Sequence, residues 1–241
     1  MRIPRIYSTQ TLALEQALRL EQKPSHHISK VLRLVAGDEL DLFDGRGGQY
    51  RARIEAVSKK WVEVITTDFD AEDRESPLHI HLGIAISKGD RMDQVMQKAT
   101  ELGVSTITPL YAARSQIKLK GERAEKKVDY WRQITVAACE QCQRNRLPQV
   151  QDIAHLSDWV AHCEVQQKFV LHHRSVGQID QQQAVDSVAL LVGPEGGLDS
   201  DEIDEAERAG YQSLTLGPRV LRTETAPLAA ISLLQHLWGD L

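Results

Sequence analysis

The spacing of apolar residues changes near residue 70, and this change restricts the possible folds more than any other feature of the chain. Between residues 39 and 66, apolar and polar residues alternate, which is the pattern of half-buried β-strands. After residue 77, short apolar runs alternate with stretches of helical spacing, such as residues 91–104 and 122–144. That alternation predicts a parallel sheet with helices on both faces. We therefore expect a small antiparallel β-domain or barrel followed by an α/β domain.

An acidic run separates the two patterns. Residues 68–75 hold five acidic residues and one arginine, a composition that is most simply explained by a solvated linker. Residues 1–67 hold 11 lysines and arginines against 8 acidic residues, so the first domain is mildly basic. A second basic stretch, residues 114–148, holds nine lysines and arginines against four acidic residues. This stretch is either a solvated helix face or a surface that contacts phosphates.

The composition excludes several classes of protein. The chain of 241 residues has a net charge of −5, so it is not a uniformly basic nucleic-acid-binding protein. Its three cysteines do not make a disulfide framework and indicate a reducing compartment. No stretch reaches the ~18 apolar residues of a membrane span, and the first apolar run is too short for a signal peptide. We expect a cytoplasmic protein that does not contact a membrane.

A glycine-rich loop, residues 193–197 (GPEGG), follows an apolar strand and precedes a helix. Glycines allow a ligand to approach backbone N–H groups closely. Asp199, with Glu202 three residues later, predicts a capping box at the helix start. The loop lacks the lysine of a phosphate loop and is followed by acidic residues. It is therefore either a plain strand-to-helix turn or the site of a neutral or cationic ligand.

A second Gly-Pro pair ends another predicted strand, at residues 217–218. Pro227 suits the first turn of the last helix, where N–H groups have no intrahelical partner. Between the two lie Arg219, Arg222 and Glu224, with threonines that could simply be helix caps. Because charged residues gather beside a second glycine-proline loop, we interpret this segment as part of the same functional site.

The pair Cys139 and Cys142 has the spacing of a metal or redox motif. Both cysteines lie inside an expected amphipathic helix, whereas a zinc finger requires a turn between strands. The histidines that follow do not have the finger spacing either. We therefore expect no metal site.

The motifs resemble a known family. The runs LLVGPEGGLDSDEI (190–203) and LGPRVLRTETAPLAAI (216–231) are similar to the cofactor-binding region of the SPOUT methyltransferases. RIPRIY at residues 2–7 and AACEQC at 137–142, leading to RNR, resemble specifically the ribosomal RNA small subunit methyltransferase E family.

This resemblance implies an α/β protein with an N-terminal PUA-like, RNA-binding β-barrel over residues 1–70. A SPOUT methyltransferase domain over residues 76–241 would follow, with a C-terminal trefoil knot. It also implies a homodimer that uses S-adenosylmethionine, and no metal, to methylate N3 of uridine 1498 in 16S ribosomal RNA of the small ribosomal subunit. The dimer agrees with the last helix, which has almost no polar face between residues 226 and 238.

The resemblance and the two loops together give a set of expected site residues. The expected catalytic residues are Arg222, which would stabilise negative charge on the base, Glu224, a candidate proton acceptor or ligand of the cofactor amine, and the weaker candidate Glu140. The expected cofactor-binding residues are Gly193, Pro194, Glu195, Gly196, Gly197, Leu216, Gly217, Arg219, Leu221, Thr223, Thr225 and Ala226. The expected RNA contacts are Arg2, Arg5, Arg114, Lys118, Arg144 and Arg146.

Two alternative functions stay open at this point. One is a non-enzymatic RNA-binding assembly factor that has lost the transfer chemistry, although the intact glycines in both loops speak against it. The other is a methyltransferase that acts on a transfer RNA ribose or guanine, as other SPOUT members do. Binding of S-adenosylmethionine distinguishes the first, and the mass of 16S RNA from a deletion strain distinguishes the second.

Overall fold

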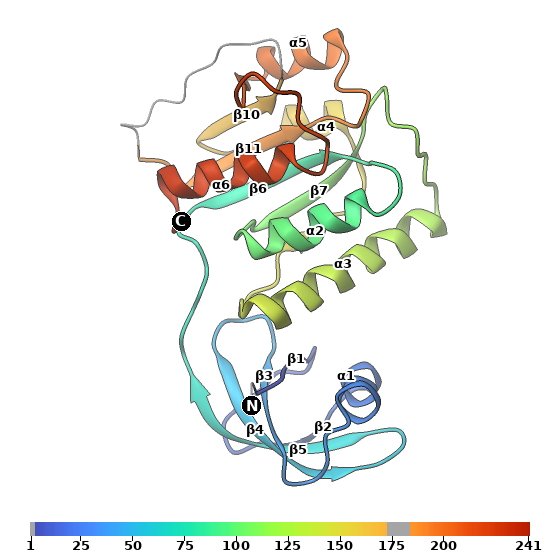
Figure 1. Ribbon diagram of the computed structural model, residues 1–241, viewed down its shortest axis with the longest axis vertical. Helices are drawn as coiled ribbons and strands as arrows, with labels where there is room; N and C mark the ends of the chain where they lie inside the picture. The colour runs from blue at the N-terminus through green and yellow to red at the C-terminus, as the bar shows by residue number, and fades with distance from the viewer. Residues whose placement is uncertain (1–2, 173–183) are drawn as a thin grey trace. The chain divides into compact units, whose positions relative to one another are not determined.

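The computed structural model describes residues 3–172 and 184–241 (Figure 1). The chain forms two compact units. Unit 1 comprises Met1–Glu75 and Cys139–Leu147, and unit 2 comprises Ser76–Ala138 and Pro148–Leu241. The predicted boundaries, 1–70 and 76–241, differ from these units because residues 139–147 belong to unit 1.

Unit 1 is built on a five-stranded sheet with the order β1-β3-β4-β5-β2. Its strands are β1 (Arg5–Tyr7), β2 (Ala17–Arg19), β3 (Glu39–Phe43), β4 (Gln49–Val57) and β5 (Val62–Asp70). The alternation at residues 39–66 forms β3 to β5 as predicted, and these strands pair antiparallel. The β1–β3 pair is parallel, so the prediction of a purely antiparallel domain is wrong at that edge.

Helical residues close the core of unit 1. They begin as α1 (Gln22–His26) and continue as a π-helical segment, η1 (His27–Leu32). Ile28 from this segment packs against inward-facing strand residues such as Leu40, Ile54 and Val64. These side chains are at most 1 % exposed, so period-two patterning correctly identified the buried face.

Residues 139–147 are fixed within unit 1 by the segment that was predicted to be a solvated linker. Arg144 is 4 % exposed and forms an ion pair with Glu75. The Asn145 amide donates to Glu72 O (2.8 Å), and Arg146 pairs with Asp73 (3.0 Å). The linker prediction is wrong for residues 68–70, which belong to β5, and for Arg74 and Glu75, which are partly buried; Glu72 and Asp73 are exposed, as predicted.

Unit 2 contains a seven-stranded sheet with the order β12-β10-β11-β6-β7-β8, in which β9 also pairs with β7. Every pair in this sheet is parallel, as predicted. The strands are β6 (His79–Ala85), β7 (Thr106–Tyr111), β8 (Gln149–Val150), β9 (Ala154–His155), β10 (Gln167–Leu171), β11 (Ser187–Val192) and β12 (Gln212–Leu214).

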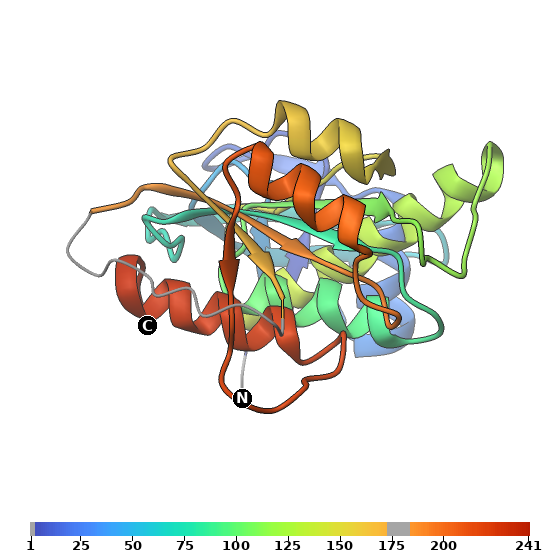
Figure 2. The ribbon, with the colours of Figure 1, turned by 90° about the horizontal axis from the view of Figure 1, so that it is seen from above.

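Helices cover both faces of this sheet (Figure 2). One face carries α2 (Arg91–Glu101), α6 (Ala226–Trp238) and the unit 2 part of α3 (Glu122–Cys142), and the other carries α4 (Leu156–His162) and α5 (Ser200–Arg208). Successive residues of β11 separate the two cores: Leu190 packs on the α2 and α6 side, whereas Ala189 and Leu191 pack on the α4 and α5 side. A strand buried on both faces explains the continuous apolar run at residues 188–192.

None of the helices in the described part of the chain has both the length and the apolar character that a transmembrane span requires.

Candidate functional site

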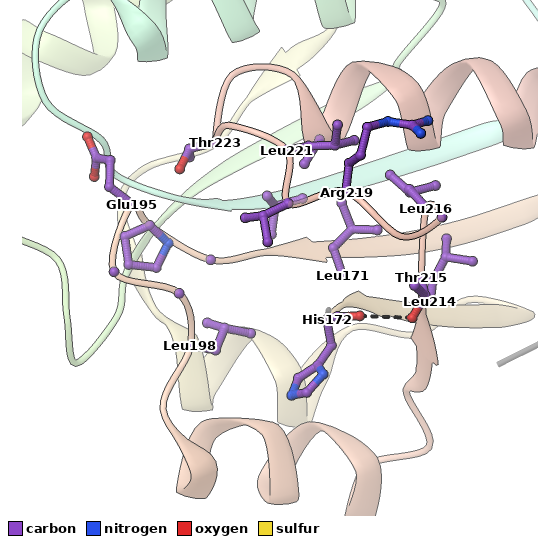
Figure 3. A pocket seen from close by; sticks show the side chains of 18 residues that line it. Leu171, His172, Glu195, Leu198, Leu214, Thr215, Leu216, Arg219, Leu221 and Thr223 are labelled. Atoms are coloured by element: carbon purple, nitrogen blue, oxygen red, sulfur yellow. Dashed lines mark hydrogen bonds between the residues drawn. The ribbon is translucent and has the colours of Figure 1, made fainter. Parts of the chain in front are cut away.

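A cavity of about 270 Å³ lies where three neighbouring parallel strands of unit 2 end. Strands β10, β11 and β12 end at Leu171, Val192 and Leu214, and all three residues line the cavity. Carboxyl ends of adjacent parallel strands are the usual ligand position in open α/β sheets. The two loops that follow β11 and β12 complete the walls (Figure 3).

The first loop folds back on itself because residue 193 is a glycine. A Cβ atom on Gly193 would lie 2.9 Å from the Leu198 amide nitrogen and 3.0 Å from Leu198 Cγ, closer than packed atoms allow. Gly197, at φ 70°, donates its N–H to Pro194 O (2.8 Å) and closes the turn. The glycines of this loop are therefore required by its geometry.

The predicted capping box is present where this loop enters α5. The Asp199 side chain accepts the Glu202 N–H (2.9 Å), and the Glu202 carboxylate accepts the Asp199 N–H (3.0 Å). Leu198 and Ile203, on either side of the capping box, pack in the same apolar cluster, which is the pattern of a hydrophobic staple. The loop is thus held rigidly at its exit.

The second loop is tied to the neighbouring strand and to α6. The Thr215 hydroxyl donates to His172 O (3.0 Å), the contact drawn in Figure 3. The Thr225 and Ala226 amides both donate to Arg222 O (2.9 Å each), which forms a turn at the start of α6. Pro227 lies in the first turn of that helix, as predicted.

Eleven of the twelve expected cofactor-binding residues line this cavity. They are Gly193, Pro194, Glu195, Gly196, Gly197, Leu216, Gly217, Arg219, Leu221, Thr223 and Ala226. Thr225 does not line it and is the N-cap of α6, without a side-chain capping bond. Sequence reasoning missed the apolar residues supplied by the strand ends and by Leu198 and Val220.

The lining is polar at its ends and apolar between them. In Figure 3, Glu195 and Arg219 lie on opposite sides, with Leu221 and Thr223 between them, and Leu198 lies lower, beside His172. An apolar slot with few polar groups is typical of a site for one small molecule.

Glu195 is held by the loop that follows β6. Its Oε1 accepts the Lys88 N–H (2.9 Å) and the Arg91 guanidinium (2.6 Å). Burial alone would raise the pKa of Glu195, but hydrogen bonds from the Lys88 backbone and from Arg91 outweigh it, so the pKa is lowered. The carboxylate is therefore ionised and points a fixed negative charge at this side of the cavity.

Arg91 joins the two loops, and no sequence motif indicated it. Besides Glu195, its guanidinium lies 3.5 Å from Glu224 Oε2 in the second loop. Glu224 Oε2 is buried and has no hydrogen-bond donor of its own. The spatial adjacency of β6 and β11 brings Arg91 to these carboxylates, which spacing along the chain does not reveal.

The expected catalytic residues divide between the two units. Arg222 and Glu224 lie in the second loop of unit 2, where neither lines the cavity but the intervening Thr223 does. The Arg222 side chain is 81 % exposed and only 3.9 Å from Glu224 Oε1. Glu140 lies in unit 1, where its Oε1 accepts the Tyr7 N–H (3.0 Å) and burial raises its pKa.

The geometry argues against two of the expected RNA contacts. Arg5 is 8 % exposed and donates to Gln49 Oε1 (2.9 Å), to Cys139 O (2.8 Å) and to Asn145 Oδ1. Arg144 is bound to Glu75. Both guanidinium groups hold unit 1 together and are not available to phosphates, so we withdraw Arg5 and Arg144 as RNA contacts.

The other expected RNA contacts have mixed surroundings. Arg114 donates to Gly196 O (2.9 Å) and Leu198 O (3.4 Å), so it supports the first cavity loop. Lys118 is exposed, and Arg146 is half-exposed beside Asp73. Arg2 lies outside the described residues. Within residues 3–172 and 184–241, no group of three potential metal ligands is found.

Comparison with known proteins identifies related sequences over nearly the whole chain. Residues 74–235 match the family described as RNA methyltransferase domain, and residues 20–67 match the RNA methyltransferase PUA domain. A ribosomal RNA small subunit methyltransferase E from Buchnera aphidicola (Schizaphis graminum strain) is 37 % identical and covers 100 % of this chain and 98 % of its own. The protein of the same name from Bacillus subtilis is 33 % identical, over 88 % and 86 %.

Solved structures agree with the sequence matches. A methyltransferase from Legionella pneumophila, crystallised with bound S-adenosylmethionine, superimposes with a TM-score of 0.96 at 42 % identity, over 100 % of both chains. A ribosomal RNA small subunit methyltransferase E from Neisseria gonorrhoeae, also with S-adenosylmethionine, gives a TM-score of 0.93 at 38 % identity, over 99 % of each.

Proposed function

Because the chain belongs to the family of ribosomal RNA small subunit methyltransferases E, we propose that it methylates N3 of uridine 1498 in 16S ribosomal RNA. It is a methyltransferase that uses S-adenosylmethionine and acts on RNA of the small ribosomal subunit. One observation carries the assignment of the site: eleven of twelve expected cofactor-binding residues line one cavity at the ends of β10, β11 and β12.

The cavity suits S-adenosylmethionine chemically. Leucine side chains from the strand ends and both loops offer an apolar slot for a purine. The ionised Glu195 suits a cationic ligand, and Gly193 keeps the first loop folded where a Cβ atom would clash. When bound, this cofactor supplies a methyl group on a positively charged sulfur. The protein's own residues then have to bind and orient the base.

Uracil must lose its N3 proton before N3 can accept a methyl group, so negative charge develops on the ring. We assign the stabilisation of that charge to Arg222, because it follows Leu221 and precedes Thr223 in sequence, both of which line the cavity, and its guanidinium is exposed. Glu224 is our first candidate for the proton acceptor, because its Oε2 is buried without a hydrogen-bond donor. The alternative role for Glu224 is to bind the cofactor amine, and Glu140 remains a weaker candidate acceptor.

Three further features belong to the proposal. The chain after β12, at one sheet edge, returns across the sheet so that α6 packs near α2 and β11, which supports a C-terminal trefoil knot. One face of α6 is incompletely covered, with Ala229 exposed and Leu233 and Leu237 partly exposed, and this supports a homodimer built on that helix. We also propose a cytoplasmic location, a PUA-like RNA-binding domain over residues 1–70 and a SPOUT domain over 76–241.

Two experiments test the function. Mass analysis of 16S RNA from a strain that lacks the gene should show one methyl group missing from a uridine, and the purified protein with S-adenosylmethionine should restore it. A methyl group missing from transfer RNA instead would favour the alternative substrate. Absence of S-adenosylmethionine binding in calorimetry would favour a non-enzymatic assembly factor.

The catalytic assignment has its own test. Arg222→Ala should retain S-adenosylmethionine affinity and lose turnover by about 100-fold, the order expected for removal of one charge-stabilising donor. Thr225→Ala is the matched control in the same loop, because Thr225 neither lines the cavity nor caps α6 through its side chain. Full turnover by Arg222→Ala would show that another group stabilises the base.

A further inference from the structure

Unit 2 contains a second cavity, of about 630 Å³, beside the start of α2 and the start of α3. The volume is within the range of about 300–1,000 Å³ that is usual for small-molecule sites. Ile117 and Leu119, which are partly exposed, give it an apolar floor, whereas the lining residues Ile86 and Trp131 are almost fully buried. In Figure 1, α2 and α3 lie on the same side of the sheet, and their first turns approach the loop that follows β6.

The rim of this cavity is basic in a chain that is acidic as a whole. Arg123, Lys126 and Lys127 line it from successive turns of α3. Lys127 is paired with Asp93 (3.2 Å), and Lys126 with Glu122 (2.7 Å) at an exposed position. Arg123 is exposed and, among the described residues, has no hydrogen-bond or ion-pair partner.

The lining holds three cations against two carboxylates, Asp90 and Asp93, so it keeps one net positive charge, and the Asp93 oxygens are bonded within the protein. They accept hydrogen bonds from Lys127 Nζ (3.2 Å), the Tyr130 hydroxyl (2.7 Å) and Trp131 Nε1 (3.2 Å). These bonds also fix the Tyr130 ring, which lines the cavity and is 48 % exposed. Lys127 Nζ lies over one face of the Tyr130 ring, 4.2 Å from its centroid, and Arg123 lies two turns earlier on α3. The exposed part of this ring and the unpaired arginine suit a group that has both an aromatic face and a negative charge.

The same loop serves both cavities. Ser87, Gly89 and Asp90 line the second cavity, whereas Lys88 N–H and Arg91 hold Glu195 beside the first. The second cavity is therefore next to the methyl-transfer site, at a distance of a few residues along one loop. Lys118, an expected RNA contact, lies between two residues that line it, Ile117 and Leu119.

We propose that the second cavity binds one nucleotide of the substrate RNA other than the methylated uridine. Arg123 and Lys126 contact the phosphate, and the base lies on the apolar floor against Tyr130. The inference rests on the proposed function for the identity of the RNA. It also adds RNA contacts in the first two turns of α3, where none of the residues expected from the sequence lies.

The test compares Arg123→Glu with Arg208→Glu. Arg208 is also exposed on a helix of unit 2 but lines neither cavity, so it controls for the change in net charge. The affinity of labelled protein for unmethylated small ribosomal subunits is measured by fluorescence anisotropy from 50 to 200 mM salt. Arg123→Glu should weaken binding by about tenfold and reduce the slope of log K against log salt by about one, as expected for a lost phosphate contact.

A second variant tests the stacking contact. Tyr130→Ala should weaken RNA binding by about tenfold and leave the salt slope unchanged, because stacking releases no counterions. The Kd for S-adenosylmethionine should be the same in all variants. The cavity proposal is overturned if Arg123→Glu and Tyr130→Ala bind subunits as Arg208→Glu does. A different result would overturn only the proposed function: both variants bind subunits more weakly, as expected, but the wild-type protein does not methylate them.

Discussion

His81 provides a quantitative prediction about acid stability. In unit 2 its Nε2 lies 3.1 Å from Trp159 Nε1 and 2.7 Å from Thr108 Oγ1. An indole nitrogen can only donate, so Nε2 is the acceptor and the neutral ring carries its proton on Nδ1, facing Cys163 Sγ at 3.5 Å. Protonation of Nε2 would oppose the Trp159 N–H. Burial accordingly lowers the pKa of His81 to about 4.

The lowered pKa makes folding sensitive to acid. Between about pH 6.5 and pH 4, His81 is protonated in the unfolded chain but neutral in the folded protein. The free energy of unfolding therefore falls as the pH is lowered through this range. With the folded pKa at about 4, linkage gives a loss of about 2 kcal/mol between pH 7 and pH 5 from this residue alone.

The assay is urea unfolding, followed by circular dichroism at pH 7, 6 and 5, for the wild type and His81→Gln. Glutamine has no titrating group, so the variant should be less stable at pH 7 but should lose about 2 kcal/mol less than the wild type on acidification to pH 5. All other titrating groups are common to both proteins and cancel in the difference. Parallel losses, within about 0.5 kcal/mol of each other, would refute the reasoning.

Three further predictions concern contacts described above. Gly193→Ala should raise the Kd for S-adenosylmethionine at least tenfold in calorimetry, because the new Cβ atom would lie 2.9 Å from the Leu198 amide nitrogen. Gly210→Ala is the control: Gly210 has φ 87° but does not line the cavity, so this variant should lower only the melting temperature. Arg91→Ala should raise the same Kd about tenfold, which corresponds to about 1.4 kcal/mol, because Glu195 and Glu224 lose their common partner. Arg91→Lys should restore part of the affinity. An unchanged Kd would show that the two carboxylates do not need this partner. Arg144→Ala should lower the free energy of unfolding by about 3 kcal/mol in urea titration, because it leaves the partly buried Glu75 carboxylate without its partner. Arg144→Met with Glu75→Leu should recover most of the loss.

The cofactor loops could be predicted from sequence because their function depends on local backbone geometry. A glycine such as Gly193, followed by proline at a strand end, restricts the chain wherever the loop lies. Thr225 was the exception, since a threonine before a helix can be a plain N-cap position, as it is here. Local patterning also predicted most of the longer strands, from alternation in unit 1 and from short apolar runs in unit 2, but not the two- and three-residue strands β1, β2, β8 and β9.

Contacts between distant residues could not be predicted in this way. Arg91 and Glu195 are brought together by the parallel pairing of β6 with β11, and one sequence contains no signal of that pairing. The count of charges predicted Arg5 and Arg144 as RNA contacts, because a buried, hydrogen-bonded arginine contributes the same formal charge as a solvated one. Only burial distinguishes an arginine that holds the protein together from one that can bind RNA.

Unit 1 has an unusual dependence on the order of protein synthesis. Its first segment ends at Glu75, but the ion-pair partner of Glu75 and all the hydrogen-bond acceptors of Arg5 except Gln49 belong to residues 139–147. At roughly 5–20 residues per second, a ribosome needs about 3 to 13 s to make the chain between Glu75 and Cys139. During that interval the nascent first segment lacks the partner of Glu75 and most partners of Arg5, so this unit cannot be completed before translation of the second is well advanced.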